Sequence, residues 1–260
     1  MIDLHAHILP GVDDGPADLD GSVALAKAAL ATGTRTLAAT SHVDRKFALE
    51  PADLHAALRR VRERLAADGL PLDVVQGGEL AQTRAHTLDD DGLRGIALGG
   101  GRWVLLECPL SNRAPALDPL VLDLQRRGFG VLLAHPERSP SFQRSPDALE
   151  RLIGTGALAQ VTAAAFKGDF GDLPRRTAFA MLERGLVHVL ASDTHDPSHR
   201  SPDLLVARRV LERRYGEAIE EQLAWMATDA PGAVLADIPP PERPELPRPA
   251  QRGLRRLFRA

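Results

Sequence analysis

Seven short apolar segments, separated by segments with helical periodicity, restrict the possible folds of this chain more than any other feature. The expected strands cover residues 2–8, 36–42, 72–80, 103–109, 130–137, 157–164 and 187–195. The expected helices cover residues 19–32, 51–68, 117–127, 147–153, 177–184, 203–214 and 217–228. Strands that alternate with helices run parallel, so this order predicts an α/β fold whose parallel sheet closes into a barrel.

Histidines and carboxylates occur at the ends of six of these seven expected strands. The residues are His5, His7, His42, Glu79, Glu107, His135, Asp193 and His195. Because the carboxyl ends of barrel strands meet at one mouth, we expect these side chains to lie close together. Each of them is costly to bury without a partner, and a cation can be the partner of several at once. The pattern therefore predicts a metal centre.

The first strand carries the most compact part of this pattern. His5 and His7 project from the same face of a strand, with Cα atoms about 7 Å apart. Two imidazoles at this spacing can reach one cation, because a metal–nitrogen bond is only about 2 Å long. Asp13 and Asp14 follow the turn at Pro10 as oxygen donors. Taken by themselves, His5 and His7 could also be two hydrogen-bonded histidines of a buried strand. The histidines and carboxylates at the other strand ends favour a metal site over this alternative.

Composition limits the remaining possibilities. A chain of 260 residues with 44% hydrophobic residues can form a single large α/β domain. Its net charge of −3 provides no basic field, so we expect no nucleic-acid partner. The single cysteine, Cys108, excludes an internal disulfide and is typical of a reducing compartment. No apolar run is long enough to span a membrane, and the motif that begins at Asp3 leaves no room for a signal peptide, so we expect a cytoplasmic protein.

Taken together, these motifs resemble the polymerase and histidinol phosphatase (PHP) superfamily. The resemblance rests on His5-Ala-His7, Ser41-His42, Glu79, Glu107, His135 and Asp193-Thr-His195. The opening fifteen residues, His135-Pro-Glu-Arg138 and Ala191-Ser-Asp-Thr-His195 are similar to the bacterial manganese-dependent protein-tyrosine phosphatases linked to capsule and exopolysaccharide synthesis. The similarity covers about the first 235 residues. It implies a distorted seven-stranded barrel of PHP type and three divalent metal ions, with manganese preferred and iron or zinc as alternatives.

The resemblance also implies how the ligands divide among the ions. One ion is held by His5, His7, Glu79 and Asp193, a second by Glu79, Glu107 and His135, and a third by Asp14, His42 and His195. Arg138 and Arg200 are the expected catalytic residues that hold the phosphate, because a guanidinium group matches phosphate in a bidentate manner. For Arg200, an ordinary loop position is the alternative. Two departures, Val43 and the stretch Thr162–Phe166, leave the substrate preference open.

A cysteine-dependent phosphatase mechanism is not favoured. Such enzymes place five residues between the nucleophilic cysteine and an arginine, so that backbone N–H groups surround the phosphate. Only four residues separate Cys108 from Arg113, and Pro109 removes one of the N–H donors. We therefore interpret Cys108 as a small residue at a strand end.

Three functions remain open at this point. The favoured one is a metal-dependent phosphatase that removes phosphate from protein phosphotyrosine, on a bacterial tyrosine kinase that controls polysaccharide synthesis or export. The second is a small-molecule phosphatase, such as a histidinol phosphatase. The third is a metal-binding regulatory barrel without turnover. The general acid, the physiological phosphoprotein and the oligomeric state are left open.

The composition changes near the C-terminus. We expect the phosphatase barrel to cover residues 1–237, and residues 238–260 to form a disordered proline-rich linker and basic tail. Within the tail, residues 252–259 combine four arginines with three apolar residues. A further hypothesis is that this segment makes weak contact with an anionic membrane surface.

Overall fold

The computed structural model describes residues 1–250, whose strands form two parallel sheets. The three-stranded sheet has the order β1-β2-β4 and consists of β1 (Ile2–Ala6), β2 (Thr36–Ala39) and β4 (Asp73–Gln76). The six-stranded sheet has the order β3-β5-β6-β7-β8-β9 and consists of β3 (His42–Val43), β5 (Glu79–Leu80), β6 (Trp103–Glu107), β7 (Gly130–Ala134), β8 (Leu158–Thr162) and β9 (Val189–Ala191). The α/β class with parallel strands is confirmed.

A closed seven-stranded barrel is not confirmed, because two of the expected strands are interrupted. The expected strand 36–42 divides into β2 and β3, and the expected strand 72–80 divides into β4 and β5. At the first break the Thr40 side chain accepts a hydrogen bond from the backbone N–H of Ala6, at 2.9 Å. Gly77 lies at the second break, where a Cβ atom would come within 2.9 Å of Thr40 Cγ2. The two breaks therefore pack together, and the chain passes there from one sheet to the other.

The two sheets also meet at the first and last strands. A single parallel bridge joins Ala6 to Thr194. Nearby, the backbone N–H of His7 donates to Thr194 O at 2.8 Å, and that of Asp193 donates to His5 O at 2.9 Å. These bonds bring the carboxyl end of β1 beside the loop that follows β9.

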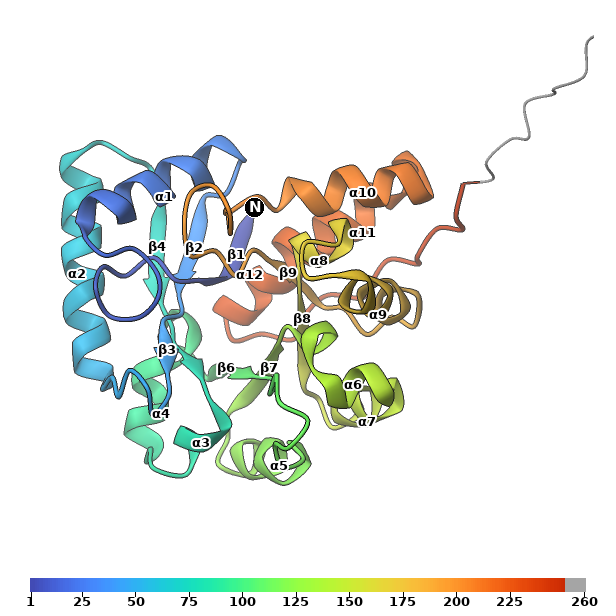
Figure 1. Ribbon diagram of the computed structural model, residues 1–260, viewed down its shortest axis with the longest axis horizontal. Coiled ribbons are helices and arrows are strands. Elements are labelled where there is room, and N and C mark those ends of the chain that lie inside the picture. The colour runs from blue at the N-terminus through green and yellow to red at the C-terminus, as the bar shows by residue number, and fades with distance from the viewer. Residues whose placement is uncertain (251–260) are drawn as a thin grey trace, which may run out of the picture.

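Helices cover the strands on the outside (Figure 1). Those that match expected helices are α1 (Leu19–Ala31), α2 (Pro51–Ala67), α5 (Asp118–Arg126), α7 (Pro146–Gly154), α9 (Asp172–Glu183), α10 (Leu205–Tyr215) and α11 (Glu220–Ala224). Five shorter helices were not expected: α3 (Gln82–Ala85), α4 (Asp90–Ile96), α6 (Pro140–Arg144), α8 (Ala163–Lys167) and α12 (Ala230–Leu235). In α4 the Asp89 side chain caps the helix by accepting from Gly92 N at 2.8 Å, a local bond that hydrophobic periodicity does not reveal.

Alternation along the strands divides the core into two clusters. Within β6, Leu105 belongs to a smaller cluster with Leu4 and Leu132, whereas Leu106 belongs to the larger cluster that includes residues of the helices. Successive side chains of a strand point to opposite faces, so each sheet residue contributes to one cluster only. Both faces of the strands are therefore buried.

The proline-rich segment after α12 contacts the body of the protein. The indole N–H of Trp225 donates to Pro241 O at 3.0 Å, and the Arg243 guanidinium lies 4.8 Å from the Trp225 ring centroid. The backbone N–H of Ala250 donates to Arg214 O at 2.8 Å. The membrane-contact hypothesis for residues 252–259 falls outside the described residues. Within residues 1–250, no helix combines the length and apolar character needed to cross a membrane.

Candidate metal centre

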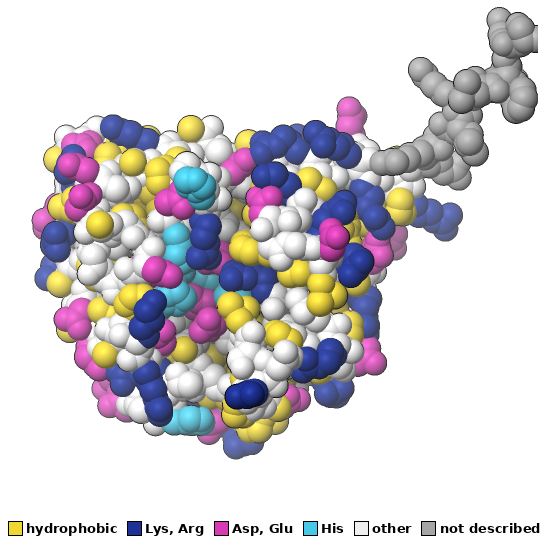
Figure 2. All heavy atoms as spheres, viewed as in Figure 1, with side chains coloured by type: hydrophobic (Ala, Val, Ile, Leu, Met, Phe, Trp, Pro, Cys, Tyr) yellow, Lys and Arg dark blue, Asp and Glu magenta, His cyan; other side chains and the backbone are white. Residues whose placement is uncertain are grey.

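Most of the histidines and carboxylates expected at strand ends lie together, although His42 and Glu79 are the first residues of β3 and β5. Figure 2 shows histidine and acidic side chains gathered with basic ones in a hollow near the middle of one face. Three groups have ligand atoms that all lie within 4.8 Å of one another: His5, His7 and Asp193; His5, Glu79 and His135; and His7, Asp14, His42 and His195. His5 belongs to the first and second groups and His7 to the first and third, so the three groups form one continuous cluster.

His5 and His7 direct their Nε2 atoms at the same point, and these two atoms are 3.3 Å apart. On the other side of each ring, His5 Nδ1 lies 3.0 Å from Gln160 Oε1 and His7 Nδ1 lies 2.8 Å from Asp13 Oδ2. Both acceptors favour a proton on Nδ1, so each imidazole in its neutral form directs the lone pair of Nε2 at the shared point. In that form the two facing lone pairs repel each other, and a cation between them removes the repulsion.

Two carboxylate oxygens approach this pair of histidines, one from Glu79 and one from Asp193. Glu79 Oε2 lies 3.3 Å from His5 Nε2 and 3.5 Å from His7 Nε2. Asp193 Oδ1 lies 3.4 and 3.6 Å from the same two nitrogens. Glu79 Oε2 is buried, and its neighbouring polar atoms include His42 Nδ1 at 3.0 Å, so imidazole nitrogens surround it. Mixed imidazole and carboxylate donors of this kind suit manganese, iron or zinc, so the residues present fit a bound metal.

Glu79 also links the first group to His135. Its second oxygen, Oε1, lies 2.8 Å from His135 Nε2, so the two oxygens of Glu79 face different members of the cluster. Glu107 belongs to none of the three groups found among the described residues. Its role as a ligand therefore stays a prediction.

The remaining group surrounds the Asp14 side chain. Asp14 Oδ1 lies 3.4 Å from His42 Nε2 and 3.3 Å from His195 Nε2. His195 Nε2 is buried without a hydrogen-bond partner in the described part of the chain. The His7 and His195 rings are tilted against each other with centroids 3.8 Å apart, which connects this group to the first.

Arg138 and Arg200 both bind Asp193. Arg138 Nη1 donates to Asp193 Oδ2 at 2.6 Å, and Arg200 Nη2 donates to the same oxygen at 2.7 Å. The other oxygen of Asp193, Oδ1, faces His5 in β1 and His7, which follows the end of that strand. The two arginines therefore stand at the border of the cluster, in contact with one of its carboxylates.

The backbone is strained where two of these side chains leave their strands. His135 has φ of 37° and Asp193 has φ of 52°, in the left-handed region that side chains other than glycine rarely adopt. Such conformations persist only where the surrounding structure enforces them, and they cluster at functional sites. Here they turn both side chains toward the cluster, with His135 directly after β7 and Asp193 two residues after the end of β9.

Attraction between opposite charges in the cluster offsets the cost of burying ionised carboxyl groups. Burial opposes ionisation of Glu79 and Asp193, but the imidazoles, His5 first, hold the pKa of each carboxyl group well below its usual range. Burial and then the charge of Glu79 raise the pKa of Glu107 to about 7. Burial and then His7 lower the pKa of His195 to about 4. The centre thus favours neutral His195 beside ionised carboxylates, which is the state that binds a cation.

Sequence reasoning named Asp13 as a donor near the strand but did not recognise it as the hydrogen-bond partner of His7, and it missed Gln160 entirely. Gln160 is fully buried in the middle of β8. An amide among apolar residues of a central strand was the available signal, since buried polar groups need a partner. Asp3 was also missed: its carboxylate accepts from Ser192 N at 3.1 Å and from Ser192 Oγ at 2.5 Å, which fixes β1 to the loop after β9.

Metal binding should release protons from the histidines of this centre. Burial works against protonation, but Glu79 raises the pKa of His5 and Asp13 raises that of His7, both above the ordinary value of 6.5. Coordination needs the neutral imidazole, so manganese has to displace these protons. We expect Mn²⁺ affinity to increase as the pH rises above 6.5, the ordinary value from which both histidine pKa values are raised. Calorimetry in two buffers of different ionisation enthalpy measures the released protons, and a pH-independent affinity without release would contradict the expectation.

Comparison with known proteins identifies the family to which this chain belongs. The fold and the cluster define a parallel α/β protein with a histidine- and carboxylate-rich centre at its strand ends. A family model described as "Capsular polysaccharide synthesis, CpsB/CapC" matches residues 1–235, and the chain belongs to this CpsB/CapC family.

Two relatives and one solved structure illustrate the family. The tyrosine-protein phosphatase YwqE of Bacillus subtilis is 32% identical over 99% of both chains. The tyrosine-protein phosphatase CpsB of Streptococcus pneumoniae is 26% identical over 91% of this chain and 99% of its own. A crystal structure from a study of YwqE and CpsB as "unique metal-dependent tyrosine phosphatases" matches with a TM-score of 0.83 and 31% identity, over 97% of this chain and 100% of the other. The family resemblance expected from the motifs is confirmed.

Proposed function

We propose that this protein is a metal-dependent phosphomonoester hydrolase that removes phosphate from phosphotyrosine in a protein. The observation that carries the proposal is the convergence of His5 and His7 with Glu79 and Asp193, beside two arginines. The family relatives named as tyrosine-protein phosphatases support the choice of phosphotyrosine. The proposal extends to three divalent ions, with manganese preferred, held by the nine predicted ligands including Glu107.

In this proposal the chain's own residues bind and orient the substrate. Bound divalent ions would supply positive charge and lower the pKa of a coordinated water. Gln160 and Asp13 fix the imidazole rings that hold the ions. Arg138 and Arg200 each have N–H groups beyond those that bind Asp193, and these would hold the phosphate oxygens in the transition state. A tyrosine leaving group has a pKa near 10, so it needs less protonation than an alkyl alcohol.

We propose that the phosphoprotein is a bacterial tyrosine kinase that controls polysaccharide synthesis or export, and that the reaction takes place in the cytoplasm. The family's connection with capsular polysaccharide synthesis supports this choice. The names of the relatives, which are tyrosine-protein phosphatases, favour a protein substrate over a small metabolite.

Turnover of two substrates tests the proposal. Protein stripped by a chelator and reloaded with manganese should hydrolyse a phosphotyrosine peptide much faster than histidinol phosphate. Phosphate release measured under identical conditions gives the ratio of kcat/KM. A preference for histidinol phosphate would support the small-molecule alternative, and a loaded protein that hydrolyses neither substrate would support the regulatory one.

Replacement of the only cysteine should leave the reaction largely intact. Cys108 is fully buried, and burial raises its pKa well above the ordinary value, whereas a nucleophilic cysteine needs a lowered pKa. We expect Cys108→Ser to retain most of the activity, and we expect chelators to inhibit while thiol alkylation does not. A folded, metal-loaded Cys108→Ser protein without activity would point to a thiol mechanism.

A further inference from the structure

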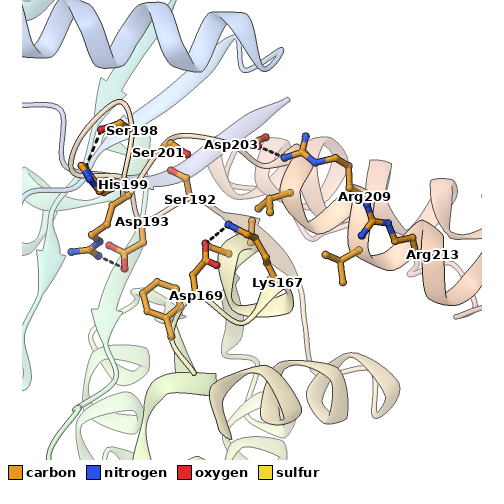
Figure 3. A pocket seen from close by; sticks show the side chains of 16 residues that line it. Lys167, Asp169, Ser192, Asp193, Ser198, His199, Ser201, Asp203, Arg209 and Arg213 are labelled. Atoms are coloured by element: carbon orange, nitrogen blue, oxygen red, sulfur yellow. Dashed lines mark hydrogen bonds and ion pairs between the residues drawn. The ribbon is translucent and has the colours of Figure 1, made fainter. Parts of the chain in front are cut away.

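A cavity opens directly beside the cluster. It has a volume of about 370 Å³ and shares Asp193 and Arg200 with the site described above. From there it extends between α8 and α10, with Lys167 and Asp169 on one side and Arg209 and Arg213 at the far end (Figure 3). A substrate whose phosphate reaches the cluster therefore has its neighbouring groups within reach of this cavity.

One face of α10 provides the far wall. Val206, Arg209, Val210 and Arg213 all line the cavity. Their spacing of three and four residues places them on a single helical face, and Arg209 and Arg213 are one turn apart, about 6 Å along the helix axis. The valines contribute apolar surface to this wall, and the two guanidinium groups give the far end of the cavity a positive charge.

The basic groups in this part of the cavity are only partly neutralised. Lys167 Nζ pairs with Asp169 at 3.1 Å, and Arg209 pairs with Asp203. Arg213 has no ion-pair partner within residues 1–250, although it lines the cavity. Arg209 pairs through only one of its guanidinium nitrogens. Exposed ion pairs such as these two are weak enough to exchange partners. An entering anion would thus find one unpaired guanidinium and two donors that can turn toward it.

We propose that this cavity is a second anion-binding subsite that recognises a negatively charged side chain next to the phosphotyrosine. The ligand is a carboxylate or a second phosphate on the same peptide. This inference rests on the proposed function, because it assigns the part of a phosphotyrosine protein that lies beside the reacting residue. Arg213 and Lys167 are the residues that distinguish acidic from neutral sequences.

Three peptides test the subsite with the manganese-loaded full chain. Each contains one phosphotyrosine, flanked by alanine and serine in the first, by glutamate in the second and by phosphoserine in the third. We expect kcat/KM to be about fivefold higher for each charged peptide than for the neutral one, because one exposed charge pair contributes about that factor. High salt should remove the difference. The glutamate and phosphoserine peptides separate the carboxylate from the phosphate as the preferred anion.

Variants of α10 and α8 assign the effect to this cavity. Arg213→Gln should bring the charged-to-neutral ratio close to one, and Arg213→Glu should invert it. Lys167→Gln, on a separate helix, should also lower the ratio and serves if the α10 variants do not fold. Arg59→Gln removes the same charge from an exposed position on α2, outside the cavity, and should leave the ratio unchanged.

The possible failures are distinct. A wild-type protein that hydrolyses all three peptides at the same rate would overturn the subsite and leave the proposed function standing. A preference for charged peptides that persists in Arg213→Glu and Lys167→Gln would also overturn it. A loaded protein that hydrolyses no phosphotyrosine peptide would overturn the proposed function, and the subsite with it.

Discussion

Glu79→Gln is expected to reduce phosphotyrosine hydrolysis by roughly a thousandfold or more, since a bound metal supplies several kcal/mol of transition-state stabilisation and each 1.36 kcal/mol changes the rate tenfold. Glutamine keeps the shape of the side chain but removes its charge. Both oxygens of Glu79 face the cluster, Oε1 toward His135 and Oε2 toward His5 and His7. The variant should therefore lose metal from more than one position, which elemental analysis of the purified protein measures.

A matched substitution separates this effect from unfolding. Glu137 is also a fully buried glutamate, two residues after His135, but it belongs to none of the three ligand groups in residues 1–250. Its Oε1 accepts from Thr162 N at 3.0 Å. Glu137→Gln should retain the metal, because Glu137 is not a predicted ligand. A Glu79→Gln protein that keeps the metal content and the activity of the wild type would disprove the bridging role.

Removal of both arginines is expected to give the second large effect, with the metal retained. Arg138→Gln combined with Arg200→Gln removes the guanidinium groups that border the cluster, and we expect kcat/KM to fall by roughly a hundred- to a thousandfold. Arg144→Gln provides the control, because Arg144 is an exposed arginine at the end of α6 whose guanidinium group donates to the Asn112 side chain. The readout is phosphate release together with metal content.

Metal content decides how this result is understood. The two arginines also neutralise Asp193, so their loss leaves a buried carboxylate that only imidazoles and a metal can compensate. A double variant with full metal and full activity would remove the arginines from the mechanism. A variant that loses activity only because the metal is lost would assign them a positioning role through Asp193 instead.

Most residues of the cluster were predictable, because His42, Glu79, His135 and Asp193 each follow an apolar run in the sequence. Parallel strands bring residues at such positions to one edge, although His42 and Glu79 begin β3 and β5 and do not end β2 and β4. The same reasoning gave the parallel α/β class. It could not place Glu107 relative to the others, because strand periodicity specifies a face and a strand end but not a side-chain rotamer.

The breaks in the sheets depend on tertiary contacts that periodicity does not contain. The run from Thr36 to His42 reads as one strand, but the Thr40 hydroxyl competes with the ladder by bonding to Ala6. Gly77 was visible in the sequence, although the need for it, close packing against Thr40, appears only in the structure. The partners of His5 and His7 lie 155 and 6 residues away, so only the nearer one, Asp13, could be suspected from the sequence.

Metal titration of the stripped protein tests the central claim most directly. Protein freed of metal with a chelator is mixed with increasing Mn²⁺, and hydrolysis of a phosphotyrosine peptide is measured beside the bound metal per chain. We predict no turnover without metal, recovery that follows occupancy, and no recovery for Glu79→Gln at the same Mn²⁺ concentrations. Full activity in a protein shown to contain no metal would contradict the account.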